Sequence, residues 1–164
     1  MEEGGTLIIS ASNQLTIGGT IVVVTGGTVV LESPLIHISA GASIVAGDLG
    51  GAGAPAAAPP DGEVAISAGT WINIHGTLTT GTVEDYADVA AAIAGLPAGA
   101  AGGVVNLSAE TLIVDGSMGV GVGSEITVTD TATINGTLTL TGAVADIDTL
   151  ELQGATLLLR TSSS

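Results

Sequence analysis

The sequence predicts an all-β fold: a short parallel β-solenoid, or β-helix, with one short capping helix. The first observation behind this prediction is composition, because 46% of the 164 residues are hydrophobic but only 1% are aromatic. Aliphatic side chains fill many small, similar layers evenly, whereas a globular core usually contains large rings. The other two observations are a rhythm of short strands and a repeated corner motif. An antiparallel β-sandwich or jelly roll is the alternative fold.

Short runs of β-forming residues recur in the first part of the chain at intervals of about eight residues, which indicates many short strands. Turn-forming steps separate the runs, as at Gly18–Gly19 and Ser33–Pro34. The runs are Leu7–Ile9, Leu15–Ile17, Ile21–Val24, Val29–Leu31, Leu35–Ile38 and Ile44–Val45. Open sandwiches and parallel β-helices both produce this rhythm.

The motif I-x-G-T-[IL] occurs at Ile17–Ile21, Ile74–Leu78 and Ile134–Leu138. In a fold built coil by coil, its first residue ends one strand facing inward. The glycine then permits a bend, and the threonine opens the next strand facing outward. Stacked coils repeat one corner, so the motif favours the solenoid over the sandwich.

The chain divides into three parts that together form one structural unit. Residues 1–46 are predicted to form strand-rich coils. Residues 47–62 are predicted to form a Gly/Ala/Pro-rich loop or arm, because Pro55, Pro59 and Pro60 cannot donate to a strand ladder and their small neighbours offer little to pack.

The third part, residues 63–164, is predicted to continue the solenoid and to contain the capping helix near residues 86–94. Apolar residues fall on one helical face there, and Gly95 followed by Pro97 ends the helix. These apolar residues are Tyr86, Val89, Ala90 and Ile93.

Residues 85–114 read DYADVAAAIAGLPAGAAGGVVNLSAETLIV. This stretch resembles the entry segment of pectate-lyase-like, right-handed parallel β-helices, as found in phage tailspikes. The resemblance implies that Tyr86–Ala94 caps the solenoid, that Leu96–Gly99 forms a turn and that Val104–Leu107 forms the first rung. The family's usual aromatic residue in the P-A-G-T-Y step is replaced within Ser108–Leu112. Too few residues follow for the family's long polysaccharide groove, so the resemblance implies architecture without activity.

The charge balance excludes several partners, because Arg160 is the only Lys or Arg against sixteen carboxylates and the formal net charge is −15. Nucleic acid and anionic lipid surfaces repel such a chain. The uncharged stretches are broken by Gly, Pro and Thr, so membrane insertion is not expected. The acidic start of the chain predicts either no cleaved signal peptide or one already removed.

An enzyme is not expected. Elimination on an acidic sugar needs a basic residue, and Arg160 is the only candidate of that kind. Asp146 and Asp148 share one side of a predicted strand around Ile147, so they could form a carboxylate pair or a weak Ca²⁺ site. The alternative for this pair is a solvated strand face, and no metal or cofactor is predicted.

The two histidines, His37 and His75, are interpreted as outward-facing polar residues. The sequence does not link one to the other, and the chain has no cysteine to complete a metal site with them.

Trp71 is the one tryptophan of the chain. It has three open interpretations: a platform that stacks on sugar, an interface anchor, or a core filler. Together with Pro55, Pro59 and Pro60 it is a candidate interface residue. The alternation of Thr and Leu at Thr137–Thr141 also suggests an ice-binding threonine face, although the sequence does not repeat that register strictly in every coil.

A solenoid has two ends whose strand edges must be covered, and one helix covers only one of them. We therefore expect a homo-oligomer, either a homotrimer or a stacked assembly. The expected function is that of a non-catalytic virion structural protein, such as a capsid decoration, head-fibre or tail-spike component. Its partners would be a capsid or tail protein, or a host-surface glycan. The alternatives are an extracellular or cell-surface adhesin or filament subunit and, third, a polysaccharide- or ice-binding solenoid.

Overall fold

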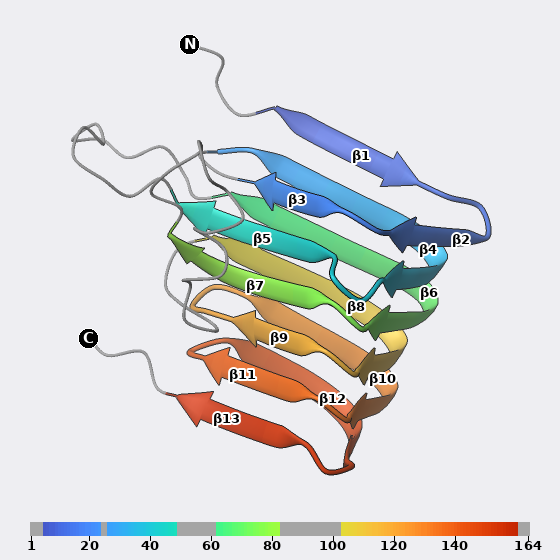
Figure 1. The fold of residues 1–164 in the computed structure, drawn as a ribbon, viewed down its shortest axis with the longest axis vertical. Helices are drawn as coiled ribbons and strands as arrows, with labels where there is room; N and C mark the ends of the chain where they lie inside the picture. The colour runs from blue at the N-terminus through green and yellow to red at the C-terminus, as the bar shows by residue number, and fades with distance from the viewer. Residues whose placement is uncertain (1–4, 24–25, 49–61, 83–102, 161–164) are drawn as a thin grey trace.

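The computed structural model describes residues 5–23, 26–48, 62–82 and 103–160, and these residues form an all-parallel β-solenoid (Figure 1). The predicted fold class is therefore confirmed. The strands are β1 Thr6–Ser10, β2 Gln14–Ile17, β3 Thr20–Val23, β4 Thr28–Ile38, β5 Ser43–Asp48, β6 Glu63–Ile74, β7 Thr77–Thr82, β8 Val104–Val114, β9 Ser117–Val120, β10 Glu125–Ile134, β11 Thr137–Thr141, β12 Val144–Leu152 and β13 Thr156–Arg160.

The strands form two parallel sheets that share a core. Sheet A runs in the order β1-β4-β6-β8-β10-β12, with β2 also paired to β4, and sheet B runs in the order β3-β5-β7-β9-β11-β13. Each coil adds a long strand to sheet A and a short one to sheet B. The stack therefore has six coils, with β1–β3 at one end and β12–β13 at the other (Figure 1).

Equivalent side chains lie directly above one another in columns, because the strands pair in register. One inner column contains Ile17, Ile38, Ile74, Val114, Ile134 and Leu152. Its members from Ile38 to Ile134 are fully buried. Each buried large aliphatic side chain contributes about 1.5–3 kcal/mol relative to exposure, so the columns of the core hold the coils together.

Each long strand of sheet A bends near its middle. The β4–β6 pairing is irregular between Ser33 and Leu35, and β6–β8 and β8–β10 show the same irregularity at the equivalent place. The sequence predicted a strand break at Ser33–Pro34, which is wrong, since β4 runs through both residues. Proline fits there because a bulge needs no ladder donor at that position.

The predicted glycine corner is confirmed, and it joins sheet A to sheet B. A Cβ atom on Gly76 would lie 2.3 Å from the carbonyl oxygen of Ala42, and one on Gly136 would lie 2.0 Å from that of Gly116. At Gly76, Gly116 and Gly136 the coils approach too closely for any side chain, whereas a Cβ atom on Gly19, in the first coil, would meet nothing within 4 Å. Val114–Met118 forms the same corner, although its sequence does not match the motif.

The predicted capping helix near residues 86–94 lies outside the described residues, as do Pro55, Pro59 and Pro60. The described ranges are all strand, turn or irregular structure. Within those ranges there is no helix with the length and hydropathy that crossing a bilayer requires.

Candidate functional site

Two features of the described surface stand out: a row of polar side chains along the glycine corner, and the two apolar ends of the stack. The first, which we call the polar corner, consists of His37, His75, Asp115 and Asn135. Backbone hydrogen bonds set its spacing, because the amides of His75, Asp115 and Asn135 each donate to a carbonyl of the preceding coil at 2.9 Å.

Asp115 is the centre of the polar corner. Its Oδ2 atom lies 3.1 Å from Nδ1 of His75, and its Oδ1 atom accepts a hydrogen bond from Nδ2 of Asn135 at 2.6 Å. His75 also meets His37 edge to face, with ring centroids 5.1 Å apart. The histidines that the sequence left unlinked are thus neighbours. Both carboxylate oxygens of Asp115 are engaged by side chains of adjacent coils, so the corner links three successive coils through side chains.

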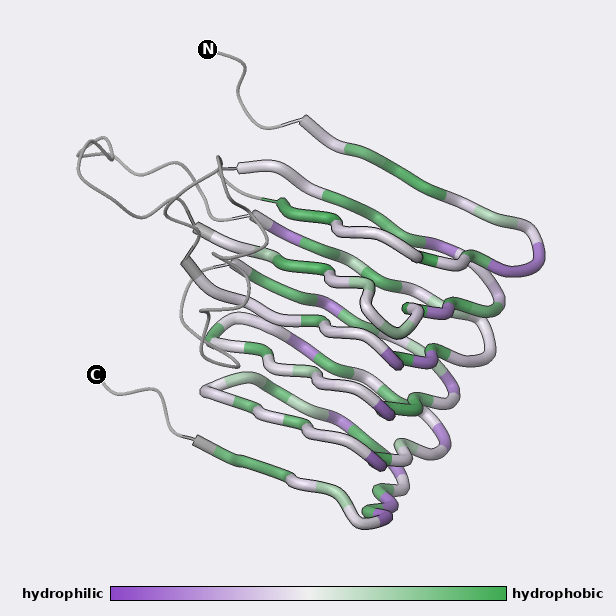
Figure 2. Tube along the Cα trace, viewed as in Figure 1, coloured by the Kyte–Doolittle hydropathy of each residue, from purple (hydrophilic) through white to green (hydrophobic). Residues whose placement is uncertain are grey.

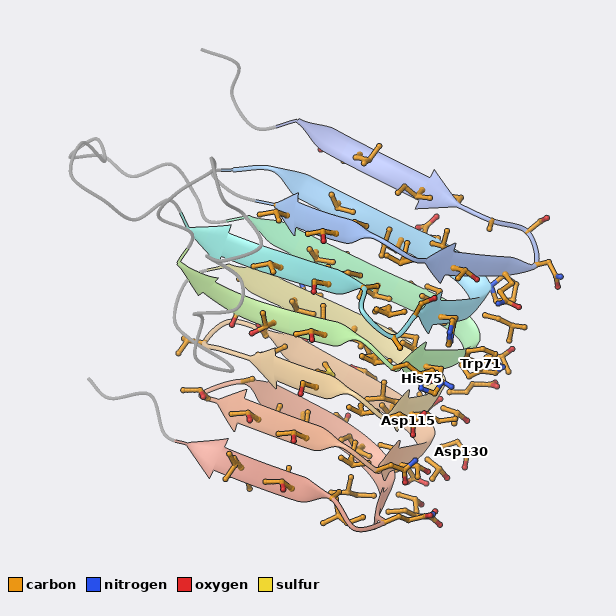
Figure 3. The ribbon with its side chains drawn as sticks, in the orientation of Figure 1. Trp71, His75, Asp115 and Asp130 are labelled. Atoms are coloured by element: carbon orange, nitrogen blue, oxygen red, sulfur yellow. The ribbon has the colours of Figure 1, made fainter. Side chains whose placement is uncertain are left out.

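Trp71 lies on the outer face of sheet A, near the polar corner (Figure 3). It is half-buried and stands between Leu35 and Thr111 in its column. The structure therefore places it on the surface, where it can serve as a stacking platform or an interface anchor, and not inside the core.

The weak metal candidates, Asp146 and Asp148, are both exposed on β12 at the last coil, while Ile147 between them packs against the core. Within the described ranges there is no group of three or more His, Asp or Glu side chains that could hold a metal ion. This arrangement is that of a solvated strand face.

A shallow hollow of about 280 Å³ lies on the outer face of sheet A. Its outward-facing lining includes Ser67, Asn106 and Ser108. Next to it, Nδ2 of Asn106 donates to Oε1 of Glu63 at 2.9 Å. The hollow offers small polar side chains over an open sheet and is too shallow to enclose a small molecule.

The threonine expectation needs correction in two respects. One hydroxyl column does repeat in every coil, because strict pairing in sheet B aligns the residues that open its strands. This column is Thr20, Ser43, Thr77, Ser117, Thr137 and Thr156. However, Thr79 is only 5% exposed and Thr139 is fully buried, so the outward alternation at Thr137–Thr141 does not give a broad exposed threonine face.

The two ends of the stack expose large aliphatic side chains. Leu7 and Ile8 on β1 are 53% and 62% exposed, and Val144 on β12 and Leu159 on β13 are 63% and 70% exposed. Figure 2 shows that β1 and β13, the outermost strands of the stack, carry hydrophobic stretches like those of the inner strands. Large exposed aliphatic residues that gather at one place indicate a contact surface.

The sequence anticipated open ends but did not identify their residues. Leu7 and Ile8 look like any other strand residues until the coil order shows that, among the described strands, β1 has a neighbour on one side only. The partners of Asp115 were missed for a similar reason, because His75 and Asn135 are far from it in sequence and meet it only through register.

Comparisons with known proteins find no counterpart. No family model matches the chain, and no curated protein or solved structure matches it either.

Proposed function

We propose that this chain is a non-catalytic virion structural protein, a capsid decoration, head-fibre or tail-spike component, that assembles as a homo-oligomer. The observation that carries the proposal is the exposure of aliphatic side chains and unpaired strand edges at both ends of the stack. Such edges template association with another strand unless they are covered. A rigid solenoid with two adhesive ends is suited to holding shape and meeting partners.

The sequence resemblance of residues 85–114 to pectate-lyase-like, right-handed β-helices of phage tailspikes supports the virion assignment through the shared architecture alone. The implied first rung is wrong, because Val104–Leu107 lies in β8, which pairs with β6 on one side and with β10 on the other. The composition supports the non-catalytic assignment, because Arg160 is the only Lys or Arg of the chain and elimination on an acidic sugar needs a basic residue.

Three measurements test the proposal. The native mass of the purified chain should exceed that of one copy, and the chain should co-purify with virus particles from an infected culture. Incubation with acidic and neutral polysaccharides should release no product. A monomeric mass at every concentration would contradict the oligomer, and turnover of any polysaccharide would contradict the non-catalytic role.

Glycan binding is the second candidate function, and the position of Trp71 favours it. This half-exposed ring lies on an outer face that also carries hydroxyl and amide side chains, including Thr111 and Asn73. Because Trp71 is the one tryptophan of the chain, its fluorescence reports directly on this face. Saturable quenching or a blue shift on titration with host-surface oligosaccharides, lost in Trp71→Ala, would support this function, and an unchanged spectrum would exclude it for the glycans tested.

A further inference from the structure

We infer that copies of this chain stack head to tail, so that β12 and β13 of one copy pair in parallel with β1, β2 and β3 of the next. This inference rests on the proposed structural function and names the interface through which the oligomer forms. The occupant of each open end is thus a second copy of the chain.

The inner columns support this pairing because each has an aliphatic residue both at the last coil and at the first coil. At the last coil, three columns stop at Leu150, Leu152 and Leu157. At the first coil, the same three columns start at Leu15, Ile17 and Ile21. If the next copy adds in the register that the coils keep within one chain, each leucine lies over the aliphatic residue of its own column. The core then continues from copy to copy without a polar interruption.

The outer face of sheet A also has aliphatic residues at both ends of one column. Ile8 and Val144 belong to one outward-facing column, whose intermediate members include Ala65 and Asn106. They are 62% and 63% exposed, because each lies in an end coil. Head-to-tail stacking places Val144 on Ile8, so that two solvent-exposed aliphatic residues cover one another.

Charge disfavours one of the two pairings of like ends, that of two last coils. The last coil carries the exposed acids Asp146, Asp148 and Glu151, whereas residues 5–23, the described part of the first coil, contain no charged side chain. Pairing two last coils would bring these acids together. Head-to-tail stacking instead places Asp146 over Ser10.

Within one chain this column already places a serine beside an acid, because the hydroxyl of Ser10 donates to Oε2 of Glu32 at 3.3 Å. The column therefore accepts a serine next to a carboxylate without distortion of the strand pairing.

Strand direction leads to the same choice. All the described strands pair in parallel, and a translation along the stack preserves that polarity. A two-fold axis at one end would instead require antiparallel edges and would misalign the columns. A head-to-tail contact does not close on itself, so it generates open linear assemblies.

The test uses three double variants with equal added charge. Leu7→Glu with Ile8→Glu blocks the first coil, and Val144→Glu with Leu159→Glu blocks the last. These four side chains are more than half exposed, so the changes leave the core of a single copy intact. The matched control is Val122→Glu with Thr70→Glu, which places two acids at exposed positions in the middle of the stack.

Sedimentation velocity and electron microscopy measure the size and shape of the assemblies that each chain forms, at concentrations up to about 1 mM. Wild type and control form linear oligomers, and each end-blocked variant alone is monomeric, with apparent association at least about 100-fold weaker. An equimolar mixture of the two blocked variants forms dimers that do not grow. The unaltered last coil of one variant pairs with the unaltered first coil of the other, and both remaining ends are blocked. Circular dichroism confirms that all variants remain folded.

Other results identify which idea fails. Oligomers of wild type that persist in both blocked variants indicate a lateral interface, such as a trimer, and overturn head-to-tail stacking while leaving the proposed function in place. Dimers of one blocked variant alone indicate pairing of like ends and also overturn it. A monomeric wild type overturns both this inference and the proposed homo-oligomer.

Discussion

The corner glycines should be among the least replaceable residues of the chain, and Gly116→Ala tests this. A Cβ atom at this position would lie 2.1 Å from the carbonyl oxygen of Gly76 and 2.5 Å from that of His75. Ordinary contacts of a Cβ atom begin at about 3.4 Å, so the backbone of one coil must move by about 1 Å.

That movement disrupts the hydrogen bonds on both sides of the corner. The amide of Gly116 donates to Ile74 at 2.9 Å, and the amides of Ser117 and Thr137 donate across the same step at 3.0 Å. Each such bond contributes about 1 kcal/mol net, and loss of the glycine's unfolded-state freedom returns about 0.4–1 kcal/mol. Lost packing between the displaced coils adds a further cost. Gly116→Ala is therefore expected to lower the free energy of unfolding by about 2–4 kcal/mol in total.

Urea unfolding, followed by the fluorescence of Trp71 and by circular dichroism, measures the change. Gly19→Ala is the matched control, because Gly19 occupies the same motif position but a Cβ atom there would meet nothing within 4 Å. It should change stability by less than about 0.5 kcal/mol, as surface substitutions usually do. Equal effects of the two substitutions would refute the close approach of the coils at Gly116.

Three further perturbations have expected outcomes. Ile72→Ala removes a fully buried side chain and should lower the free energy of unfolding in urea by about 2–5 kcal/mol. Leu158→Ala, at a site 39% exposed, should lower it by less than about 1 kcal/mol. Similar losses for the two variants would contradict the assigned core. Asn135→Ala removes the 2.6 Å bond to Asp115, which lies at an exposed position, and should cost about 0.5–1 kcal/mol. No change would show that the polar corner adds nothing to stability. Raising NaCl from about 0.05 to about 0.5 M should raise Tm, because salt screens the repulsion of a chain with net charge −15; a fall in Tm would contradict this.

The fold was predictable because its signal is local. The corner motif is a short-range requirement, since glycine is the one residue whose absent Cβ lets the backbones of adjacent coils touch. It is therefore visible at Ile74–Leu78 and Ile134–Leu138 without knowledge of register. The equivalent corner at Val114–Met118 escaped detection because Val, Ser and Met satisfy the same packing as Ile, Thr and Leu.

The repeat length was harder to see. From β8 onward, Asn106, Glu125 and Val144 follow one another in a single column at equal steps. Residues 49–61 and 83–102 are inserted between earlier strands and hide that period. Pro34 added to the difficulty, because a proline at a bulge looks the same in sequence as one that ends a strand.

The candidate site could not be predicted, because it depends on register across distant residues. Nothing in the sequence joins Asp115 to His75 and Asn135, and nothing distinguishes Ile8 from an inner strand residue. Thr139 shows the same limit, since alternation predicts that it faces solvent but it is fully buried.

A crosslinking measurement tests most directly whether the column register continues from copy to copy. Thr16 and Glu151 lie at opposite ends of one outer column. In one chain they are five coils, about 24 Å, apart, but in stacked copies they would be about 4.8 Å apart, which is within disulfide range. The chain has no cysteine, so Thr16→Cys and Glu151→Cys chains can be mixed and gently oxidised. Head-to-tail stacking predicts disulfides mainly between the two different variants, whereas oligomers that yield only like-with-like disulfides, or none, would contradict it.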